Sequence, residues 1–306
     1  MYQRHHDGSV TWRRAITVFY LNWLCSALKT LSLANLGHRY ALMRRSIRLM
    51  NIETKFQTHP VTDAAAPLIS VVVPVHNESP NIRPLVAAIG VALEGVDHEI
   101  VYVDDGSSDD SPAILAALAL ELPNFRRFRH AKSCGQSGAV ITGVKKARGT
   151  FIATLDGDGQ NDPADIPAML AAAREAENVG PRPVLIAGHR VNRKDTGSKR
   201  WGSKVANRVR SYLLRDATPD TGCGLKLFRR QAFLELPHFD HIHRFLPALF
   251  IRAGGHVVSV PVRHHARAHG ASHYNNWQRA MVGIVDLFGV AWLQRRWKVP
   301  QIESAE

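Results

Sequence analysis

Two short acidic segments, each directly after an apolar run, constrain the fold of this chain more than any other feature. Asp104 and Asp105 follow residues 99–103, and the segment Asp156-Gly157-Asp158-Gly159-Gln160 follows residues 151–155. Short apolar runs that end in turn-forming residues are typical of buried strands. Ligands of α/β sheets bind beyond the carboxyl ends of the strands, so both segments are candidates for a binding site.

The second acidic segment predicts a metal site. Asp156 and Asp158 are two residues apart, so both carboxylates point to one side of an extended chain. Oxygen ligands are what Mg²⁺ or Mn²⁺ prefers, usually together with phosphate oxygens, so we expect a metal-bound nucleotide diphosphate here. For Asp104 and Asp105, capping of the following helix is an equally good interpretation, because Asp and Ser are common helix caps.

The composition indicates a globular protein with anionic partners. Of 306 residues, 45% are hydrophobic and 21% are charged, which suits a sizeable core. The net charge of +13 favours nucleic acid, anionic lipid head groups or phosphorylated substrates. The three cysteines, Cys25, Cys134 and Cys223, lack metal-ligand spacing, which indicates a reducing compartment. No apolar run reaches the roughly 20 residues that span a bilayer, so we expect a peripheral protein on the cytoplasmic face of the inner membrane.

Three regions follow one another along the chain. Residues 1–66 combine apolar residues at helical spacing with basic residues, which predicts a basic amphipathic extension that binds a membrane surface. Packing of this extension on the main domain is the alternative. Residues 67–275 carry the main domain. Residues 276–306 place aromatic and basic residues at both ends of a short apolar segment, which predicts an amphipathic helix at the membrane interface.

The main domain alternates strand and helix patterns. This alternation predicts an α/β fold with a mostly parallel sheet, flanked by helices and joined by right-handed crossovers. The expected strands cover residues 68–74, 99–103, 125–129, 151–155, 184–188, 225–228 and 257–262. The expected helices cover residues 81–93, 111–121, 138–146, 163–177 and 198–214.

Four segments, in this order and at α/β spacing, resemble the inverting family-two glycosyltransferases. They are Pro74-Val75-His76-Asn77-Glu78, Asp104-Asp105-Gly106-Ser107, Cys134-Gly135-Gln136-Ser137-Gly138-Ala139 and Asp156-Gly157-Asp158-Gly159-Gln160. Later segments are similar to the polyprenyl-phosphate, dolichol-phosphate mannosyltransferase-like branch of that family. They are Gly188-His189-Arg190, residues 199–203, residues 220–226 and residues 267–274.

The resemblance implies a GT-A-type nucleotide-sugar-binding fold and a metal-dependent enzyme. Such an enzyme moves a sugar from a UDP- or GDP-sugar to a polyprenyl phosphate, with inversion at the anomeric centre. Mg²⁺ or Mn²⁺ would be held by Asp156, Asp158 and Gln160 and would act as a Lewis acid on the departing nucleoside diphosphate. The donor would be bound by Pro74, His76, Asn77, Glu78, Val103, Asp104 and Asp105, with Arg267 and His273 closing over its phosphates.

The resemblance also implies an acceptor-phosphate site formed by Arg190, Arg200 and Ser203, which with Asp156 and Asp158 make up the expected catalytic set. Guanidinium groups suit phosphate because they present a fork of donors. A lipid phosphate is already anionic, so it needs positioning rather than a general base. The chain departs from the family pattern with His273 in place of the usual Lys and His76 where Tyr is common. Gly157 and Gly159 are also smaller than the usual Ala and Leu.

Two alternative functions stay open. A relative that acts on a soluble or polysaccharide acceptor would need a carboxylate base, and no base-bearing motif follows Gly188. A non-catalytic basic module for lipid or nucleic acid is the other, but the pair Asp156 and Asp158 argues against it. Nucleic acid is not expected as a partner, because the basic residues between 193 and 210 are interleaved with few aromatic side chains. The sequence is compatible with a homo-oligomer.

Overall fold

The computed structural model describes residues 66–180, 182–191, 210–216, 218–266, 276–296 and 298, and the side chains of all of these except 276–282. The basic extension expected over residues 1–66 lies outside the described residues, apart from Ala66, and so do most of the expected helix 198–214 and the segment 267–275. These predictions stay predictions.

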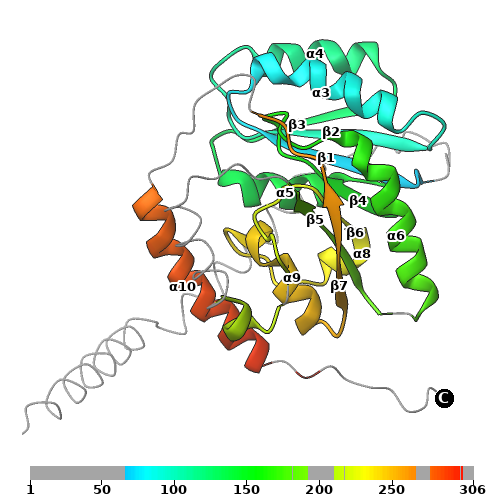
Figure 1. Cartoon of the computed structure of the whole chain (residues 1–306). Coiled ribbons are helices and arrows are strands. Elements are labelled where there is room, and N and C mark those ends of the chain that lie inside the picture. The colour runs from blue at the N-terminus through cyan, green and yellow to red at the C-terminus, as the bar shows by residue number, and fades with distance from the viewer. Residues whose placement is uncertain are drawn as a thin grey trace, which may run out of the picture. The chain divides into compact units, whose positions relative to one another are not determined.

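Seven strands among the described residues form one sheet (Figure 1). Their order is β3-β2-β1-β4-β6-β5-β7, and only β6 runs antiparallel to its neighbours. The mostly parallel sheet that the sequence predicts is therefore confirmed. The bounds are β1 Ile69–Val75, β2 His98–Asp104, β3 Phe125–Arg129, β4 Phe151–Thr154, β5 Val184–Arg190, β6 Lys226–Arg229 and β7 His256–Val262.

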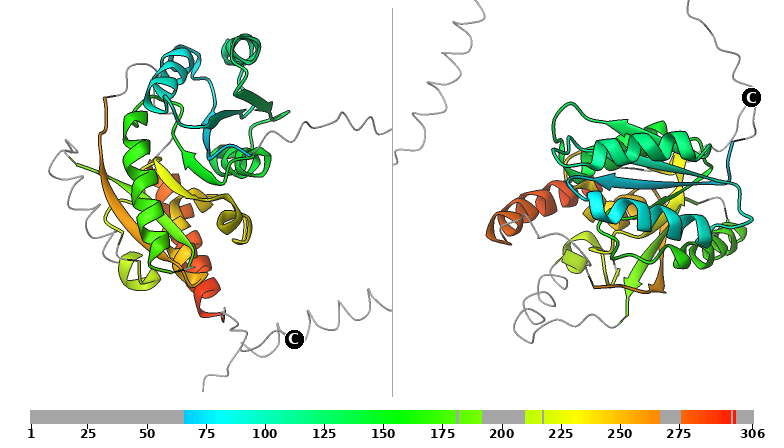
Figure 2. Two further views of the ribbon diagram at one scale, coloured as in Figure 1. Left: turned by 90° about the vertical axis from the view of Figure 1, so that its right-hand side faces the viewer. Right: turned by 90° about the horizontal axis from the view of Figure 1, so that it is seen from above.

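Helices cover both faces of this sheet. One face packs against α3 (Ser79–Ala92), α4 (Ser111–Glu121) and α6 (Ile166–Asn178), the last preceded by the short 3₁₀ helix η1 (Pro163–Asp165). The other face packs against α5 (Gly135–Lys146), α8 (Arg230–Leu234), α9 (Ile242–Arg252) and α10 (Asn276–Arg295). Helix α10 lies against α9 (Figure 2).

Strand β1 shows why two cores form. Its seven residues are all buried. Val71 and Val73 join the core beneath α3, α4 and α6, whereas Val72 joins the core beneath α5 and α9. Successive side chains of a strand point to opposite faces, so a strand covered on both sides reads as a continuous apolar run.

Among the differences from the expected elements, two concern helices beside the acidic segments. Helix α5 begins at Gly135, three residues before the predicted start, because a carboxylate directly after β2 accepts hydrogen bonds from its first N–H groups, as described below. The helix expected from Pro163 begins as the 3₁₀ turn η1, whose first N–H groups are capped because the Asp162 carboxylate accepts from the Ala164 N–H at 2.9 Å. Within the described residues, no helix is both long and apolar enough to cross a bilayer.

Candidate active site

The loops after β1, β2 and β4 meet at one edge of the sheet. From β1 the chain moves outward through β2 and β3, and then returns to place β4 on the other side of β1. This reversal is the topological switch point at which open α/β sheets bind ligands. The acidic segments that the sequence singled out lie at this edge, since Asp104 ends β2 and Asp156 follows β4 by two residues.

Hydrogen bonds hold the β1 and β2 loops together. Asn77 adopts a left-handed backbone (φ 57°), its N–H donates to Ser107 Oγ at 3.0 Å, and its side-chain oxygen accepts from the Ser108 N–H at 2.8 Å. Asn tolerates this conformation better than most residues. His76 is exposed, with Nδ1 2.9 Å from the Asp105 carbonyl oxygen, and the Glu78 carboxylate accepts from Asn81 at 2.7 Å.

Pro74 and Val103 are deeper than a ligand-contacting role implies. They are register partners in β1 and β2, and both are buried. The Val103 side chain lies beneath α5, where a Cβ on Gly143 would come within 3.3 Å of it. In the described structure these two residues support the loop edge from below.

The two aspartates at the end of β2 organise the surrounding loops. Asp104 is buried, accepts from the Ser107 N–H at 2.8 Å and lies 3.0 Å from Arg129 Nε. Asp105 caps α5: its carboxylate accepts from the Cys134 and Gly135 N–H groups, both at 2.8 Å. The capping interpretation therefore applies to Asp105, but on a helix 30 residues away. The helix that directly follows, α4, takes its cap bond from Asp109, which accepts from the Ser111 N–H at 3.0 Å.

Two further groups complete the environment of Asp105. Ser133 Oγ donates to it at 2.7 Å, and His130 Nδ1 lies 2.7 Å from its Oδ1. Burial alone would raise the pKa of this carboxyl, but the hydrogen bonds outweigh burial and hold the pKa below its ordinary value. A charged, rigidly held carboxylate therefore lies at the base of the site.

Asp156 is the most perturbed carboxylate of the edge. Burial and the neighbouring charge of Asp158 raise its pKa from 3.8 to about 6, although the cations Lys226 and Arg190 and the hydrogen bond from Gln136 act in the opposite direction. Gln136 Nε2 donates to Asp156 Oδ1 at 2.7 Å. Gly224 presses against the same carboxylate so closely that a Cβ there would collide with it.

The oxygen ligands of this loop fit a hard divalent cation. Asp156 and Asp158 bring two mutually repelling carboxylates to one loop, and a dication would neutralise both. Gln160 completes the loop: its N–H donates to Asp158 Oδ1 at 3.1 Å, and its side-chain amide donates to the His265 carbonyl at 3.3 Å. Gly157 lets this loop approach β1, since a Cβ there would lie 2.8 Å from the Pro74 carbonyl oxygen.

Arg190, at the end of β5, is held by a second, partly buried acid. Its Nε and Nη2 donate to the two oxygens of Asp220 at 2.6 and 2.8 Å, and this bidentate pair raises the pKa of Arg190. Asp220 opens a turn that Lys226 closes, since the buried Lys226 Nζ donates to the carbonyls of Thr221 and Cys223. Burial lowers the pKa of Lys226, against the charges of Asp156 and Asp220.

Sequence reasoning assigned no role to three of these residues. Gln136, Asp220 and Lys226 all stand within segments that carry the family resemblance, but their contacts are long-range. The remaining expected site residues, Arg200, Ser203, Arg267 and His273, lie outside the described residues. The chain just before Arg267 does reach the site, because His264 pairs with Asn161 and the His265 N–H donates to the Gln160 carbonyl at 2.8 Å.

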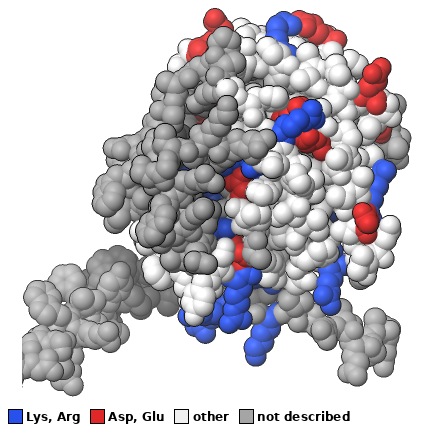
Figure 3. Space-filling model, viewed as in Figure 1, with Lys and Arg blue, Asp and Glu red and all other residues white. Residues whose placement is uncertain are grey.

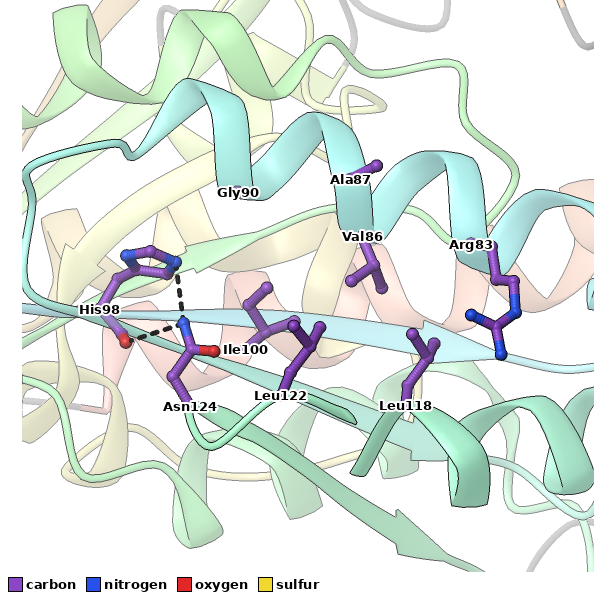
Figure 4. Close-up of a pocket in the computed structure, with 9 residues that line it drawn as sticks. All are labelled: Arg83, Val86, Ala87, Gly90, His98, Ile100, Leu118, Leu122 and Asn124. Atoms are coloured by element: carbon purple, nitrogen blue, oxygen red, sulfur yellow. Dashed lines mark hydrogen bonds between the residues drawn. The ribbon is translucent and has the colours of Figure 1, made fainter. Parts of the chain in front are cut away.

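A separate cavity of about 460 Å³ lies away from this edge, between α3, α4 and the start of β2 (Figure 4). Apolar side chains of both helices line it, and His98, Asn124 and Arg83 stand at its margin. Arg83 is already paired with Glu121 at 2.9 Å. None of the expected site residues lines this cavity, so it is not the candidate active site.

Comparison with known proteins agrees with this architecture. Residues 70–236 match the family described as glycosyl transferase family 2. The chain belongs to this family. It is 34% identical over 241 residues to the dodecaprenyl-phosphate galacturonate synthase of Rhizobium johnstonii, covering 74% of this chain and 67% of that protein. It is 33% identical over 210 residues to the undecaprenyl-phosphate 4-deoxy-4-formamido-L-arabinose transferase of an Enterobacter species, covering 68% of this chain and 62% of that protein.

Solved structures confirm the GT-A fold. A Pyrobaculum calidifontis mannosyltransferase in complex with GDP-Man and Mn²⁺ superposes with a TM-score of 0.56 at 20% identity, covering 87% of this chain and 74% of that one. The glucosyl-3-phosphoglycerate synthase of Mycobacterium tuberculosis, in complex with Mn²⁺, UDP-glucose and phosphoglyceric acid, gives a TM-score of 0.54 at 16% identity, covering 77% and 81%. At these identities the likeness establishes the fold alone.

Proposed function

We propose that this family-2 glycosyltransferase moves a sugar from a UDP- or GDP-sugar to a polyprenyl phosphate, with inversion and with Mg²⁺ or Mn²⁺ as cofactor. One observation carries the proposal: Asp156 and Asp158 lie together at the switch point, and the cation Arg190 is close enough to Asp156 to lower its pKa. Two relatives named for transfer to polyprenyl phosphates support the acceptor class.

Asp156, Asp158 and Gln160 would hold the metal, which supplies charge neutralisation for the departing nucleoside diphosphate. The chain's own residues prepare the site. Gln136 orients the Asp156 carboxylate through its 2.7 Å hydrogen bond. Lys226 fixes the turn that carries Gly224, and Gly224 lies directly against that carboxylate.

Arg190 would bind the acceptor phosphate. Asp220 occupies Nε and Nη2, and among the described residues no hydrogen bond uses Nη1, which leaves donors for a phosphate oxygen. The acceptor oxygen is already anionic, so the step needs a close, fixed approach to the anomeric carbon rather than removal of a proton. We extend the acceptor site to Arg200 and Ser203, and the donor-phosphate site to Arg267 and His273, on the family resemblance.

The nucleoside would lie over the ends of β1 and β2. Asn77, Glu78 and the exposed His76 stand on the first of these loops, and Asp104 and Asp105 anchor the second. Asp105 already accepts hydrogen bonds from Ser133, Cys134 and Gly135 at the start of α5. Its proposed contact with the nucleotide sugar would be made in addition to this helix cap. Pro74 and Val103 are buried in β1 and β2, and they would support these loops from beneath.

Helix α10 would seat the enzyme on an anionic membrane surface. Leu287, Val290 and Ala291 pack on the α9 side, whereas four apolar side chains face outward with 50–70% exposure: Ile284, Val285, Phe288 and Trp292. Exposed basic residues follow at the end of the helix, namely Arg295, Arg296 and Lys298. On the face drawn in Figure 3, Lys and Arg gather at the end of the molecule where α9 and α10 finish. An apolar stripe beside basic residues is typical of interfacial helices.

Acceptor kinetics test the proposal most simply. Wild-type protein is assayed with a panel of UDP- and GDP-sugars and with polyprenyl phosphate as the varied substrate. Replacement of Arg190 by Gln should raise the acceptor KM about 10-fold or more, since a charge-assisted phosphate contact is worth about 1.5–3 kcal/mol, and should change the donor KM little. Arg263→Gln is the matched control, because this exposed arginine pairs with Asp162 and Asp165 beside the site. Efficient transfer to a soluble acceptor, or a change in the donor KM alone, would refute the assignment.

A further inference from the structure

A second group of metal-ligating side chains lies beside the candidate active site. One oxygen of Asp105, one imidazole nitrogen of His130 and the sulfur of Cys134 all lie within 4.8 Å of one another. Asp105 is buried, His130 is partly buried and Cys134 is exposed. Three ligands converge from the end of β2, the end of β3 and the start of α5.

The ligands are held in place by neighbours that a metal would not displace. His130 Nε2 lies 2.9 Å from Thr142 Oγ1, which fixes the ring while Nδ1 faces Asp105. The second oxygen of Asp105 accepts from Ser133 Oγ at 2.7 Å and from the Gly135 N–H at 2.8 Å. Outer hydrogen bonds of this kind orient the ligands of metal sites.

The charges of this group suit a dication. A carboxylate and a thiolate together balance two positive charges, so the occupied site would be neutral. Cys134 is the residue that precedes the first turn of α5, and the positive end of that helix favours the negative charge a ligating sulfur carries. A combination of sulfur, imidazole and carboxylate selects zinc over magnesium, which prefers oxygen alone.

We propose that Asp105, His130 and Cys134 form a zinc site, with a fourth position open to solvent. Three protein ligands with one open position are the arrangement of accessible zinc sites. The site is distinct from the Asp156 and Asp158 loop, although α5 touches both, through its cap at Asp105 and through Gln136. If the proposed function is correct, zinc at Asp105 lies in the donor pocket and inhibits the enzyme in competition with the nucleotide sugar.

Cobalt absorption tests the site without reference to activity. Co²⁺ is titrated into the full-length protein, with excess Mg²⁺ present to occupy oxygen-only sites. The expected result is a thiolate-to-cobalt charge-transfer band in the near ultraviolet, which equimolar Zn²⁺ abolishes. Cys134→Ser should remove the band, and His130→Gln should weaken Co²⁺ binding at least 10-fold. Absence of the band in the wild-type protein would overturn the proposal.

Two control variants locate the band. Cys25→Ser removes a thiol from another part of the sequence and should leave the band unchanged. Asp158→Asn alters the catalytic acid pair and should also leave it unchanged. A band that survives in Cys134→Ser or disappears in Cys25→Ser would place the sulfur ligand elsewhere and overturn the proposal.

Inhibition tests the functional consequence separately. Micromolar Zn²⁺ should raise the donor KM of the wild-type enzyme at least 10-fold, and Cys134→Ser should relieve this effect while keeping its activity in Mg²⁺ alone. If the cobalt band forms but no transfer is detected with any donor, the zinc site stands and the proposed function fails. Equal inhibition of the wild type and Cys134→Ser would refute the inhibitory role.

Discussion

Replacement of Asp156 by Asn is expected to stabilise the metal-free protein while it abolishes glycosyl transfer. Asp156 is a charged group in a place that disfavours charge: burial and Asp158 raise its pKa from 3.8 to about 6. Asn has nearly the same shape, and its side-chain oxygen can still accept the hydrogen bond from Gln136. The substitution therefore removes the unfavourable charge and retains the local packing.

The pKa shift sets the size and the pH range of this effect. A shift from 3.8 to about 6 corresponds to about 3 kcal/mol, at about 1.36 kcal/mol per pKa unit. Because the carboxylate is partly accessible to water, we expect a gain of about 1–3 kcal/mol in the free energy of unfolding at pH 7. The folded-state pKa is raised, so the ionised carboxylate destabilises the fold above pH 6. This destabilisation disappears as the pH falls from about 6 toward 3.8.

Urea unfolding in EDTA, followed between pH 4 and pH 8, measures the difference between Asp156→Asn and the wild type. The gap should be largest above pH 7 and close to zero near pH 4. Asp162→Asn is the control of opposite sign: hydrogen bonds from Ala164 and His265 outweigh burial and lower the pKa of Asp162, so its variant should be less stable at pH 7. An Asp156→Asn protein that is less stable than the wild type at pH 7 would refute the reasoning.

Two other predictions follow from single contacts. Gln136→Ala should weaken activation by Mg²⁺ or Mn²⁺ about 10–100-fold, as expected for a residue that orients a metal ligand, and metal titration of activity measures this; unchanged metal dependence would contradict it. The double substitution Phe288→Ser and Trp292→Ser should reduce binding to anionic vesicles at least about 10-fold, since each buried aromatic contributes roughly 1.5–3 kcal/mol. Leu120 of α4 is 91% exposed, and the control Leu120→Ser should leave vesicle binding unchanged. Equal flotation of the wild type, the double variant and Leu120→Ser would exclude α10 as the membrane contact.

Local patterns were sufficient to predict the sheet and the edge of it where the acidic segments lie. Strands β2 and β4 are short apolar runs that end in turn residues, whereas β3 combines two phenylalanines with three arginines. The expected bounds of all three strands agree with the structure within one residue at each end. The carboxyl ends of parallel strands meet at one edge of the sheet, so the sequence alone assigns Asp104 and Asp156 to the same edge. The helices α8 and α9 were not predicted, because α8 has only five residues and α9 carries Pro247 in its interior.

The contacts that shape the site could not be predicted, because they join residues far apart in the sequence. Asp105 caps α5 across 30 residues, and that bond explains why the helix begins at Gly135. Arg190 and Asp220 are also 30 residues apart. The sequence shows no metal-ligand spacing around Cys134, because one of the two ligating side chains near it, Asp105, comes from another strand end. The terminal extensions, the membrane contact and a homo-oligomer remain predictions.

The most direct test of the central claim is the identity of the reaction product. Purified protein is incubated with labelled UDP- and GDP-sugars, undecaprenyl phosphate and Mg²⁺ or Mn²⁺, and the organic phase is analysed by mass spectrometry. We predict a glycosyl polyprenyl phosphate whose formation requires both the lipid phosphate and the metal. The Asp158→Ala protein should remain folded but should not form this product. Product formation that persists undiminished in EDTA or in Asp158→Ala, or labelled sugar found only on water or a soluble acceptor, would contradict the account.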